Sequence, residues 1–339
     1  MGSFVDHLTE DPERNQRLWR RRAEPVIGKV QPWCSEFLAP STVLAEGDLL
    51  VVYVEGSGEG REQIGVFTCP LAEVEHQAWV PHPDNPILEV GKQGAFDRGS
   101  VFDPSVVRFG DRHLLYYSAT TGDAHGFAAE LLGGVPETLL PSGETVGLAV
   151  GDGPFRFTKR EENPVMAGRC PHAFVWEGRV FLYFVRVADG GYRIHLAISG
   201  DGVHFTEAQG EPVLSPGGVG EWDARSVTTP CVFSEDGAFY MLYAGDAEGL
   251  DDPTGIGIAV STDLLRWEKL VGNPIFVTGE PGRFDSASVA GPRLKRFGDT
   301  YFLWYGGSDR KIRDGLNSQI GVAQMPSGTG SECSGATEV

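Results

Sequence analysis

Short apolar runs rich in β-branched and aromatic residues recur along the chain at wide, regular intervals. The run 301–305, for example, consists of five large hydrophobic residues and follows a turn that contains Gly298. Runs of this kind between turn residues predict buried β-strands. Five such runs end in an aromatic residue, which in every case stands thirteen residues after a proline. The prolines are Pro40, Pro104, Pro171, Pro230 and Pro292, and the aromatics are Tyr53, Tyr117, Phe184, Tyr243 and Tyr305. A constant offset in five places predicts five copies of one structural unit.

Each copy continues with a glycine-containing apolar run, such as 146–150, 256–260 or 320–323. In four copies a further segment starts at an aromatic residue and reaches a proline seven residues later; these aromatics are Trp79, Phe157, Phe205 and Trp267. The fifth copy lacks this segment, whereas Trp19 near the N-terminus is followed by Pro25. We therefore expect the N-terminal strand to complete the last copy.

Five units of four strands predict an all-β fold, a five-bladed β-propeller with four-stranded antiparallel blades that the N-terminal strand closes. Closure removes the open sheet edges that separate units would leave. The expected blades span about 31–90, 91–166, 167–216, 217–278, and 279–325 together with 17–28. Residues 326–339 are rich in Gly and Ser and are expected to form a disordered tail. A β-sandwich with accidental periodicity is the alternative fold.

Composition narrows the functional classes. The 339 residues carry a formal net charge of −19, which disfavours nucleic acid as a partner because such proteins need a basic surface. No apolar run has the length of a membrane span, and residues 1–20 lack the apolar stretch of a signal peptide. The five cysteines are odd in number and lack metal-ligand spacing, and no cofactor motif is present. We expect a cytoplasmic protein without metal or cofactor, whose oligomeric state the sequence leaves open.

In a propeller, the innermost strands of all blades line one central channel, so the residues just before the five prolines should converge. Only one of these residues, Asp103, is acidic. A carboxylate at such a mouth is poorly solvated and near other acids, which suits acid–base chemistry. Glu36 stands four residues before Pro40, at a position where no other unit has an acid. Asp103 and Glu36 are therefore candidate catalytic residues, although Asp103 could instead cap a turn.

Three units carry an aromatic–Asp pair seven residues before the proline: Phe96-Asp97, Trp222-Asp223 and Phe284-Asp285. Because the pair repeats, a structural role is one interpretation. The other makes Asp223 a catalytic residue and gives Asp97 and Asp285 a place in substrate binding. Trp33 and Trp222 are candidate platforms for stacking on a sugar ring, or else packing residues. The third unit departs from the others with Arg169, Cys170 and His172. We expect Arg169 and His172 to bind sugar hydroxyls or a phosphate, together with Arg98 and Arg225.

The segment 102–107, which contains Asp103-Pro104, together with 114–117, resembles the five-bladed glycosidases. These include glycoside hydrolase families 43, 32 and 130, and the resemblance covers about residues 17–325. It implies two or three catalytic carboxylates at the hub. Arg169-Cys170-Pro171 looks like the Arg-Asp-Pro of family 32 with Cys in place of the acid, and Ala39 stands where a first-blade Asp is expected. The family's usual carboxylate set is therefore incomplete in this chain.

The resulting hypothesis is a glycoside hydrolase-like enzyme that acts on a small glycoside or oligosaccharide. Asp103 would act as the general acid or would adjust the pKa of the residue that does, and Asp223 or Glu36 would supply the second carboxylate. One alternative is a propeller enzyme with other chemistry, a glycoside phosphorylase or an acid–base isomerase or cyclase. Another is a sugar-binding propeller without catalysis.

Overall fold

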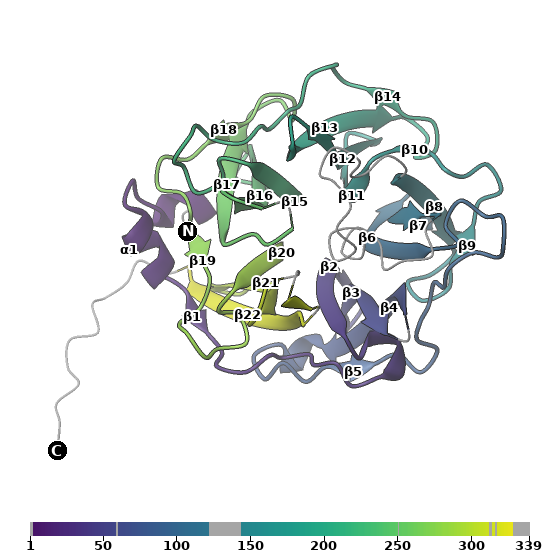
Figure 1. The fold of residues 1–339 in the computed structure, drawn as a ribbon, viewed down its shortest axis with the longest axis horizontal. Helices are drawn as coiled ribbons and strands as arrows, with labels where there is room; N and C mark the ends of the chain where they lie inside the picture. The colour runs from purple at the N-terminus through teal and green to yellow at the C-terminus, as the bar shows by residue number, and fades with distance from the viewer. Residues whose placement is uncertain are drawn as a thin grey trace.

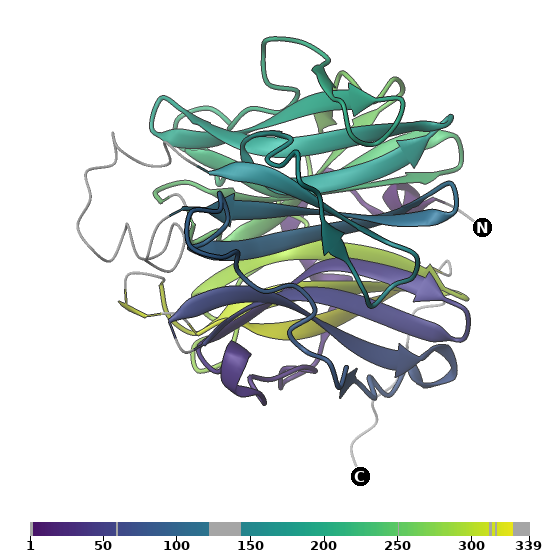
Figure 2. The same cartoon turned by 90° about the vertical axis from the view of Figure 1, so that its right-hand side faces the viewer.

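The computed structural model describes residues 3–58, 60–121, 144–249, 251–311, 314–315 and 317–327. Five β-sheets are arranged like blades around a central axis (Figure 1). Seen from the side, the strands run across the thickness of this ring (Figure 2). The predicted five-bladed propeller is confirmed.

Successive long strands in each blade pair antiparallel, and the two innermost strands of each blade are joined by a tight hairpin. The first blade contains β2 (Phe37–Glu46), β3 (Leu49–Gly58), β4 (Arg61–Pro70) and β5 (Val80–Pro81). The second contains β6 (Ser100–Phe109), β7 (Arg112–Thr120), β8 (Thr145–Gly151), β9 (Thr158–Lys159) and β10 (Met166–Ala167). The third contains β11 (Arg169–Trp176), β12 (Arg179–Ala188), β13 (Gly191–Ser199) and β14 (Thr206–Glu207).

The fourth blade contains β15 (Ser226–Glu235), β16 (Ala238–Asp246), β17 (Gly255–Ser261), β18 (Glu268–Lys269) and β19 (Phe276–Val277). The fifth contains β20 (Ser288–Phe297), β21 (Thr300–Ser308), β22 (Gln319–Pro326) and, from the N-terminus, β1 (Arg20–Arg21). The short helices are η1 (Phe4–His7), α1 (Pro12–Arg17), η2 (Pro32–Cys34) and η3 (Leu71–Glu73). Within the described residues, no helix is long and apolar enough to cross a membrane.

The ring closes where the N-terminal strand joins the last blade. In β1, Arg20 pairs with Gln324 and Arg21 with Ala323, as the repeat pattern predicts. Figure 1 shows this segment beside β22 and β19. The buried indole of Trp19 packs edge-on against Phe276 of the fourth blade, with the ring centres 6.1 Å apart. Of the predicted tail, residues 328–339 lie outside the described part of the chain.

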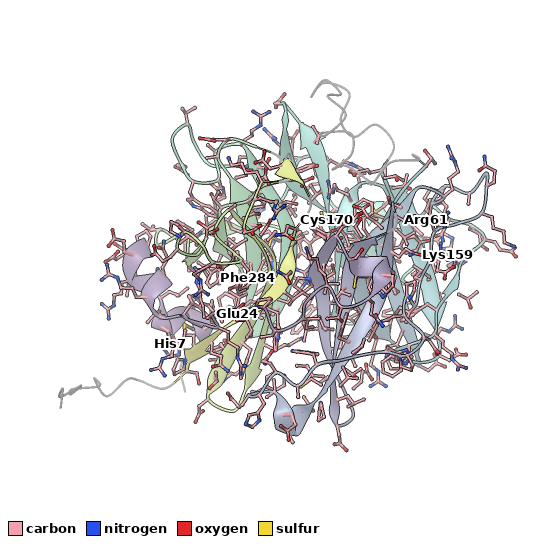
Figure 3. The ribbon with its side chains drawn as sticks, turned by 60° about the horizontal axis from the view of Figure 1, so that its bottom comes forward. His7, Glu24, Arg61, Lys159, Cys170 and Phe284 are labelled. Carbon is pink, nitrogen blue, oxygen red and sulfur yellow. The ribbon has the colours of Figure 1, made fainter. Side chains whose placement is uncertain are left out.

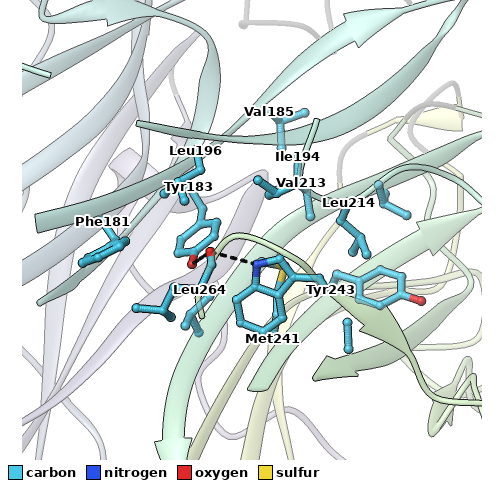
Figure 4. Packing of buried hydrophobic residues seen from close by; sticks show 14 of the residues in the cluster. Phe181, Tyr183, Val185, Ile194, Leu196, Val213, Leu214, Met241, Tyr243 and Leu264 are labelled. Atoms are coloured by element: carbon cyan, nitrogen blue, oxygen red, sulfur yellow. Dashed lines mark hydrogen bonds between the residues drawn. The ribbon is translucent and has the colours of Figure 1, made fainter. Parts of the chain in front are cut away.

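The hydrophobic core is divided into clusters that fill the gaps between neighbouring blades. Figure 4 shows the cluster between the third and fourth blades, where Tyr183 and Val185 face Met241 and Tyr243. The Tyr183 hydroxyl donates to the carbonyl of Leu264 over 2.8 Å, so a buried polar group in this cluster is satisfied. The blades are thus held together mainly by apolar side chains along their broad faces.

Candidate functional site

A β-bulge interrupts the innermost strand of four blades at the residue before the proline. Asp103, Cys170, Thr229 and Gly291 all have positive φ there, between 47° and 59°. A bulge re-aims the side chain at its position, and a non-glycine residue with positive φ is held there by its surroundings. All four residues line one cavity at the hub. The bulges therefore aim Asp103 and Cys170 toward the axis of the ring, and Figure 3 places Cys170 near its middle.

This cavity lies where the five innermost strands meet. Its empty volume is about 980 Å³, counting the space open to solvent at its mouth. Every blade contributes to the wall, and the charged residues that line it are Glu55, Glu62, Asp103, Arg169, Asp251, Asp252, Arg293 and Arg310. Among the described residues, no group of three or more His, Cys, Asp and Glu side chains is placed to hold a metal ion.

Glu55 and Asp103 form a carboxyl pair in this cavity. Glu55 Oε2 accepts a hydrogen bond from the Asp103 backbone N–H over 2.8 Å, and the two side chains also hydrogen bond to each other. Burial and then the charge of Asp103 raise the pKa of Glu55 well above its usual value. Asp103 Oδ2 accepts from the Ser118 hydroxyl over 2.8 Å and from the Cys170 N–H over 3.2 Å. A hydrogen bond between two carboxyl groups needs a proton on one of them, and the raised pKa of Glu55 favours Glu55 as the group that carries it.

Two further carboxyls of the cavity have raised pKa values. Burial raises the pKa of Glu62 to about 7, although a hydrogen bond with Ser100 and the charge of Arg169 oppose the rise. Oε2 of Glu62 is buried and has no hydrogen-bond partner among the described residues. Burial also raises the pKa of Asp251 to about 6, again against the charge of Arg169. Groups that titrate this close to neutrality suit proton transfer.

Arg169 of the third blade connects acids of the second and fourth blades. Its Nη1 lies 3.1 Å from Asp251 and 3.7 Å from Glu144, and its Nε lies 4.0 Å from Asp103. The same Nη1 donates to the Tyr192 hydroxyl over 2.8 Å. The structure thus places predicted residues Asp103 and Arg169 together at the hub.

The repeated aspartates lie elsewhere. Asp97, Asp223 and Asp285 are buried between strands, and none of them lines the cavity. Asp97 accepts from the Tyr117 hydroxyl over 3.1 Å, and Asp285 accepts from the Tyr305 hydroxyl over 2.7 Å. Each also binds a cation: Lys159 for Asp97, Lys269 for Asp223, and both Arg21 and Arg283 for Asp285. This placement supports the structural interpretation and gives no support to Asp223 as the second catalytic carboxylate.

The predicted aromatic platforms also serve packing. The ring of Trp33 packs so closely on Gly65 that a Cβ at this position would lie 2.4 Å from it. A Cβ at Gly245 would lie 2.3 Å from the ring of Trp222. Neither Trp lines the cavity. Glu36 is exposed and outside the cavity, and its Oε2 accepts from Ser57 over 3.1 Å. Gly65 and Gly245 explain the positions of the two Trp side chains, because a glycine leaves room for the indole ring between strands.

His172 belongs to a belt of hydrogen bonds between innermost strands. Its Nε2 accepts from the Val232 N–H of the next blade over 2.8 Å, as Ser105 Oγ accepts from Ala173. Burial lowers the pKa of His172 to about 3, so the ring is neutral. His172 does not line the cavity, and neither do the remaining predicted arginines, Arg98 and Arg225. Nε of Arg225 donates to the Gly190 carbonyl over 3.0 Å.

Sequence reasoning missed four acids of the cavity: Glu55, Glu62, Asp251 and Asp252. A signal for Glu55 existed. It stands fifteen residues after Pro40, where the second, fourth and fifth units have Ala119, Gly245 and Gly307. Glu62 and Asp251 lie after turns of irregular length, so the repeat offers no register by which to find them.

No protein-family model matches the chain. An uncharacterised protein of Mycobacterium tuberculosis (strain CDC 1551 / Oshkosh) is 26% identical over 278 residues, which cover 77% of this chain and 85% of that protein. A 1,2-beta-oligomannan phosphorylase of Thermoanaerobacter sp. (strain X514) is 28% identical over 127 residues, which cover 35% of this chain and 42% of that enzyme.

Solved structures share the whole fold at low sequence identity. A protein solved in an RGII complex has a TM-score of 0.70 at 13% identity, and the match covers 98% of this chain and 98% of that protein. A structure from work on family 130 mannoside phosphorylases, which include hydrolases that target β-1,2-mannosidic linkages in Candida mannan, has a TM-score of 0.63 at 16% identity and covers 90% of this chain and 93% of that one. The chain therefore has the propeller fold found in glycoside hydrolase structures, as the sequence resemblance implied.

Proposed function

We propose that this protein is a carbohydrate-active enzyme that cleaves a glycosidic bond in the hub cavity by carboxyl acid–base catalysis. The observation that carries the proposal is the Glu55–Asp103 pair, in which the two carboxyl side chains hydrogen bond to each other and burial and the neighbouring carboxyl raise the pKa of Glu55. The fold shared with glycoside hydrolase structures, and the partial likeness to an oligomannan phosphorylase, support the same class of substrate.

In the proposed reaction, Glu55 donates its proton to the glycosidic oxygen as the bond to C1 breaks. Glu62 in its ionised form accepts a proton from a water molecule, whose oxygen then forms the new bond to C1. Oε2 of Glu62, which has no hydrogen-bond partner in the described part of the chain, and the pKa of about 7 fit this role. Asp103 keeps Glu55 protonated before the reaction, and Arg169 holds Asp251 and Asp103 in place.

The arginines of the cavity favour hydrolysis over phosphorolysis. Arg169 is bound to carboxylates, Arg293 donates to backbone carbonyls, and Nε of Arg310 donates to Asp309 over 3.1 Å. Glu62, Asp103, Asp251 and Asp252 can add negative charge to the same wall. A phosphate dianion would have to displace existing partners and approach several carboxylates. Phosphorolysis is the second candidate, because the matched oligomannan phosphorylase catalyses it.

The test is turnover of β-1,2-linked mannose oligosaccharides and of arabinan, xylan and fructan oligosaccharides, each with and without inorganic phosphate. Sugar release that does not need phosphate supports hydrolysis. Release that requires phosphate and yields a sugar phosphate would establish the second candidate. Binding without any turnover would instead make the protein a sugar-binding propeller and contradict the proposal.

A further inference from the structure

Ser118 breaks the repeat at a buried position of the second blade. It lies on β7, fourteen residues after Pro104. The other four units have an apolar residue or a glycine at this offset: Val54, Val185, Ala244 and Gly306. The Ser118 side chain is fully buried and does not line the hub cavity. Because a buried hydroxyl costs free energy unless its hydrogen bonds are made, its contacts should explain its presence.

Two β-bulges of the hub direct backbone N–H groups at side chains of the preceding blade. The Asp103 N–H donates to Glu55 Oε2 of the first blade over 2.8 Å. The Cys170 N–H is shared between two oxygens of the second blade, Ser118 Oγ over 2.9 Å and Asp103 Oδ2 over 3.2 Å. Ser118 and the bulge at Cys170 therefore act on the same carboxyl oxygen.

The direction of each of these hydrogen bonds is fixed. An amide N–H can only donate, so Ser118 Oγ accepts from Cys170, and its own hydrogen remains for Asp103 Oδ2 at 2.8 Å. Oδ2 thus accepts from two donors, and the proton that joins Asp103 to Glu55 does not lie on this oxygen. The raised pKa of Glu55 favours Glu55 as the group that carries the proton.

The other titratable groups that face Asp103 come from the four other blades. Nε of Arg169 lies 4.0 Å from Oδ2. The remaining groups interact with Asp103 electrostatically, and they are Glu55, Glu62, Cys170, Asp251 and Arg293. Ser118 differs from all of them because it is neutral and its hydroxyl is hydrogen bonded to one carboxyl oxygen.

We infer that Ser118 is a positioning residue of the carboxyl pair, which holds Asp103 Oδ2 as an acceptor and so leaves the shared proton to Glu55. This inference rests on the proposed function. In each turnover the bond between C1 and the glycosidic oxygen breaks, and that oxygen takes the proton of Glu55. Water oxygen forms the new bond to C1, and its proton passes to Glu62. Ser118 takes part in no bond change, and it acts only on where the proton lies before the reaction.

The test compares two kinds of substrate in the full chain carrying Ser118→Ala. The substrates are β-1,2-mannobiose, xylobiose and arabinobiose, each paired with the 2,4-dinitrophenyl glycoside of the same sugar. A sugar hydroxyl needs a proton to leave, whereas 2,4-dinitrophenolate does not. On the disaccharide we expect kcat to fall about 10–100-fold and KM to change less than about threefold, since a hydrogen bond to the acid pair is lost. On the dinitrophenyl glycoside, kcat should change less than about threefold.

Ser105→Ala is the matched control. Ser105 is also a buried serine of the second blade, its Oγ accepts from the Ala173 N–H over 2.8 Å, and it does not line the cavity. This variant should keep wild-type turnover on both substrates, at a temperature where circular dichroism shows a native spectrum. Ser118→Thr keeps the hydroxyl and should retain most of the wild-type kcat. If Ser118→Ala does not fold, Ser118→Cys carries the same test, because a thiol is a weak donor.

Equal losses on the two substrates, or no loss on either, would overturn the inference. Glu55→Gln then decides on the proposed function separately, because a loss confined to the disaccharide in that variant leaves Glu55 as the proton donor. If the wild-type protein cleaves none of the six substrates, both the inference and the proposed function fall.

Discussion

Glu55 and Glu62 belong to neighbouring strands of the first blade and line the same cavity, yet their surroundings differ. Glu55 lies against another carboxyl, which adds to the effect of burial on its pKa. For Glu62, a hydrogen bond with Ser100 and the charge of Arg169 partly offset the rise in pKa that burial causes. Two acids whose pKa values are moved by different amounts provide a proton donor and a proton acceptor at one pH.

Replacement of Glu55 by Gln removes the proposed proton donor without a change in size. We expect kcat on an active glycoside to fall by about 10²–10⁴-fold, the usual contribution of a positioned acid. Asp103→Asn is expected to lose turnover as well, since the neutral amide no longer holds the proton on Glu55. Glu36→Gln is the matched control, because Glu36 is an exposed glutamate outside the cavity. Equal activity of Glu55→Gln and Glu36→Gln would remove Glu55 from the mechanism.

The pH dependence of kcat/KM follows from the same two groups. Glu62 must be ionised, so activity is expected to rise with pH with an apparent pKa near 7. Glu55 must be protonated, so activity is expected to fall again at higher pH, where that carboxyl finally ionises. In Glu62→Gln, the residual activity should lose the rising limb. A wild-type optimum at pH 4–5 with no rise toward neutrality would contradict these roles.

At the scale of the elements, the aspartate of the repeated aromatic–Asp motif links strands of one blade through buried polar contacts. In the fourth blade, Asp223 is fully buried and binds Lys269 over 2.6 Å, and a hydrogen bond with the Tyr243 hydroxyl completes the group. Equivalent groups exist around Asp97 and Asp285. The aromatic that stands thirteen residues after the proline is thus the partner of the aspartate in three blades.

Asp223→Asn leaves the cation at Lys269 without its counter-charge. We expect the free energy of unfolding to fall by about 3–5 kcal/mol, as when one partner of a buried pair is removed. The kcat of the folded fraction should stay unchanged, measured at a temperature where circular dichroism shows a native spectrum. A normal stability together with lost turnover would restore Asp223 to the catalytic candidates.

The repeated elements were predictable from the sequence, and the residues of the site were predictable only in part. The constant spacing from the five prolines locates the strands. It also places Asp103 at the hub, because the same bulge recurs in four blades. The same repetition made Asp223 a catalytic candidate, whereas its side chain lies outside the cavity and binds Lys269. Asp251 was missed because it comes to the hub from a loop, where no periodic pattern fixes the spatial position of a side chain.

At the scale of the whole molecule, stability depends on closure of the ring by the N-terminal segment. Phe4 and Trp19 are buried against the fourth and fifth blades, and Ile27 is buried between the fifth and first blades. The pairing of β1 with β22 also covers a strand edge that would otherwise be open.

Trp19→Ala tests this closure without a change in the site. Loss of a buried indole is expected to cost about 3–5 kcal/mol of unfolding free energy. Trp176→Ala is the control, since Trp176 is 38% exposed and lies on the innermost strand of the third blade. Denaturant titration should show a much smaller loss for the control. Equal losses in the two variants would mean that the N-terminal segment adds nothing particular to the ring.

The position of a bound sugar tests the central claim most directly. A crystal structure of the Glu55→Gln variant with an oligosaccharide that the wild-type protein cleaves should show a sugar ring in the hub cavity. The glycosidic oxygen is expected within hydrogen-bond distance of residue 55, with Glu62 on the opposite side of C1. A sugar bound at the outer groove beside His82 and Phe155, with the hub cavity empty, would contradict the account.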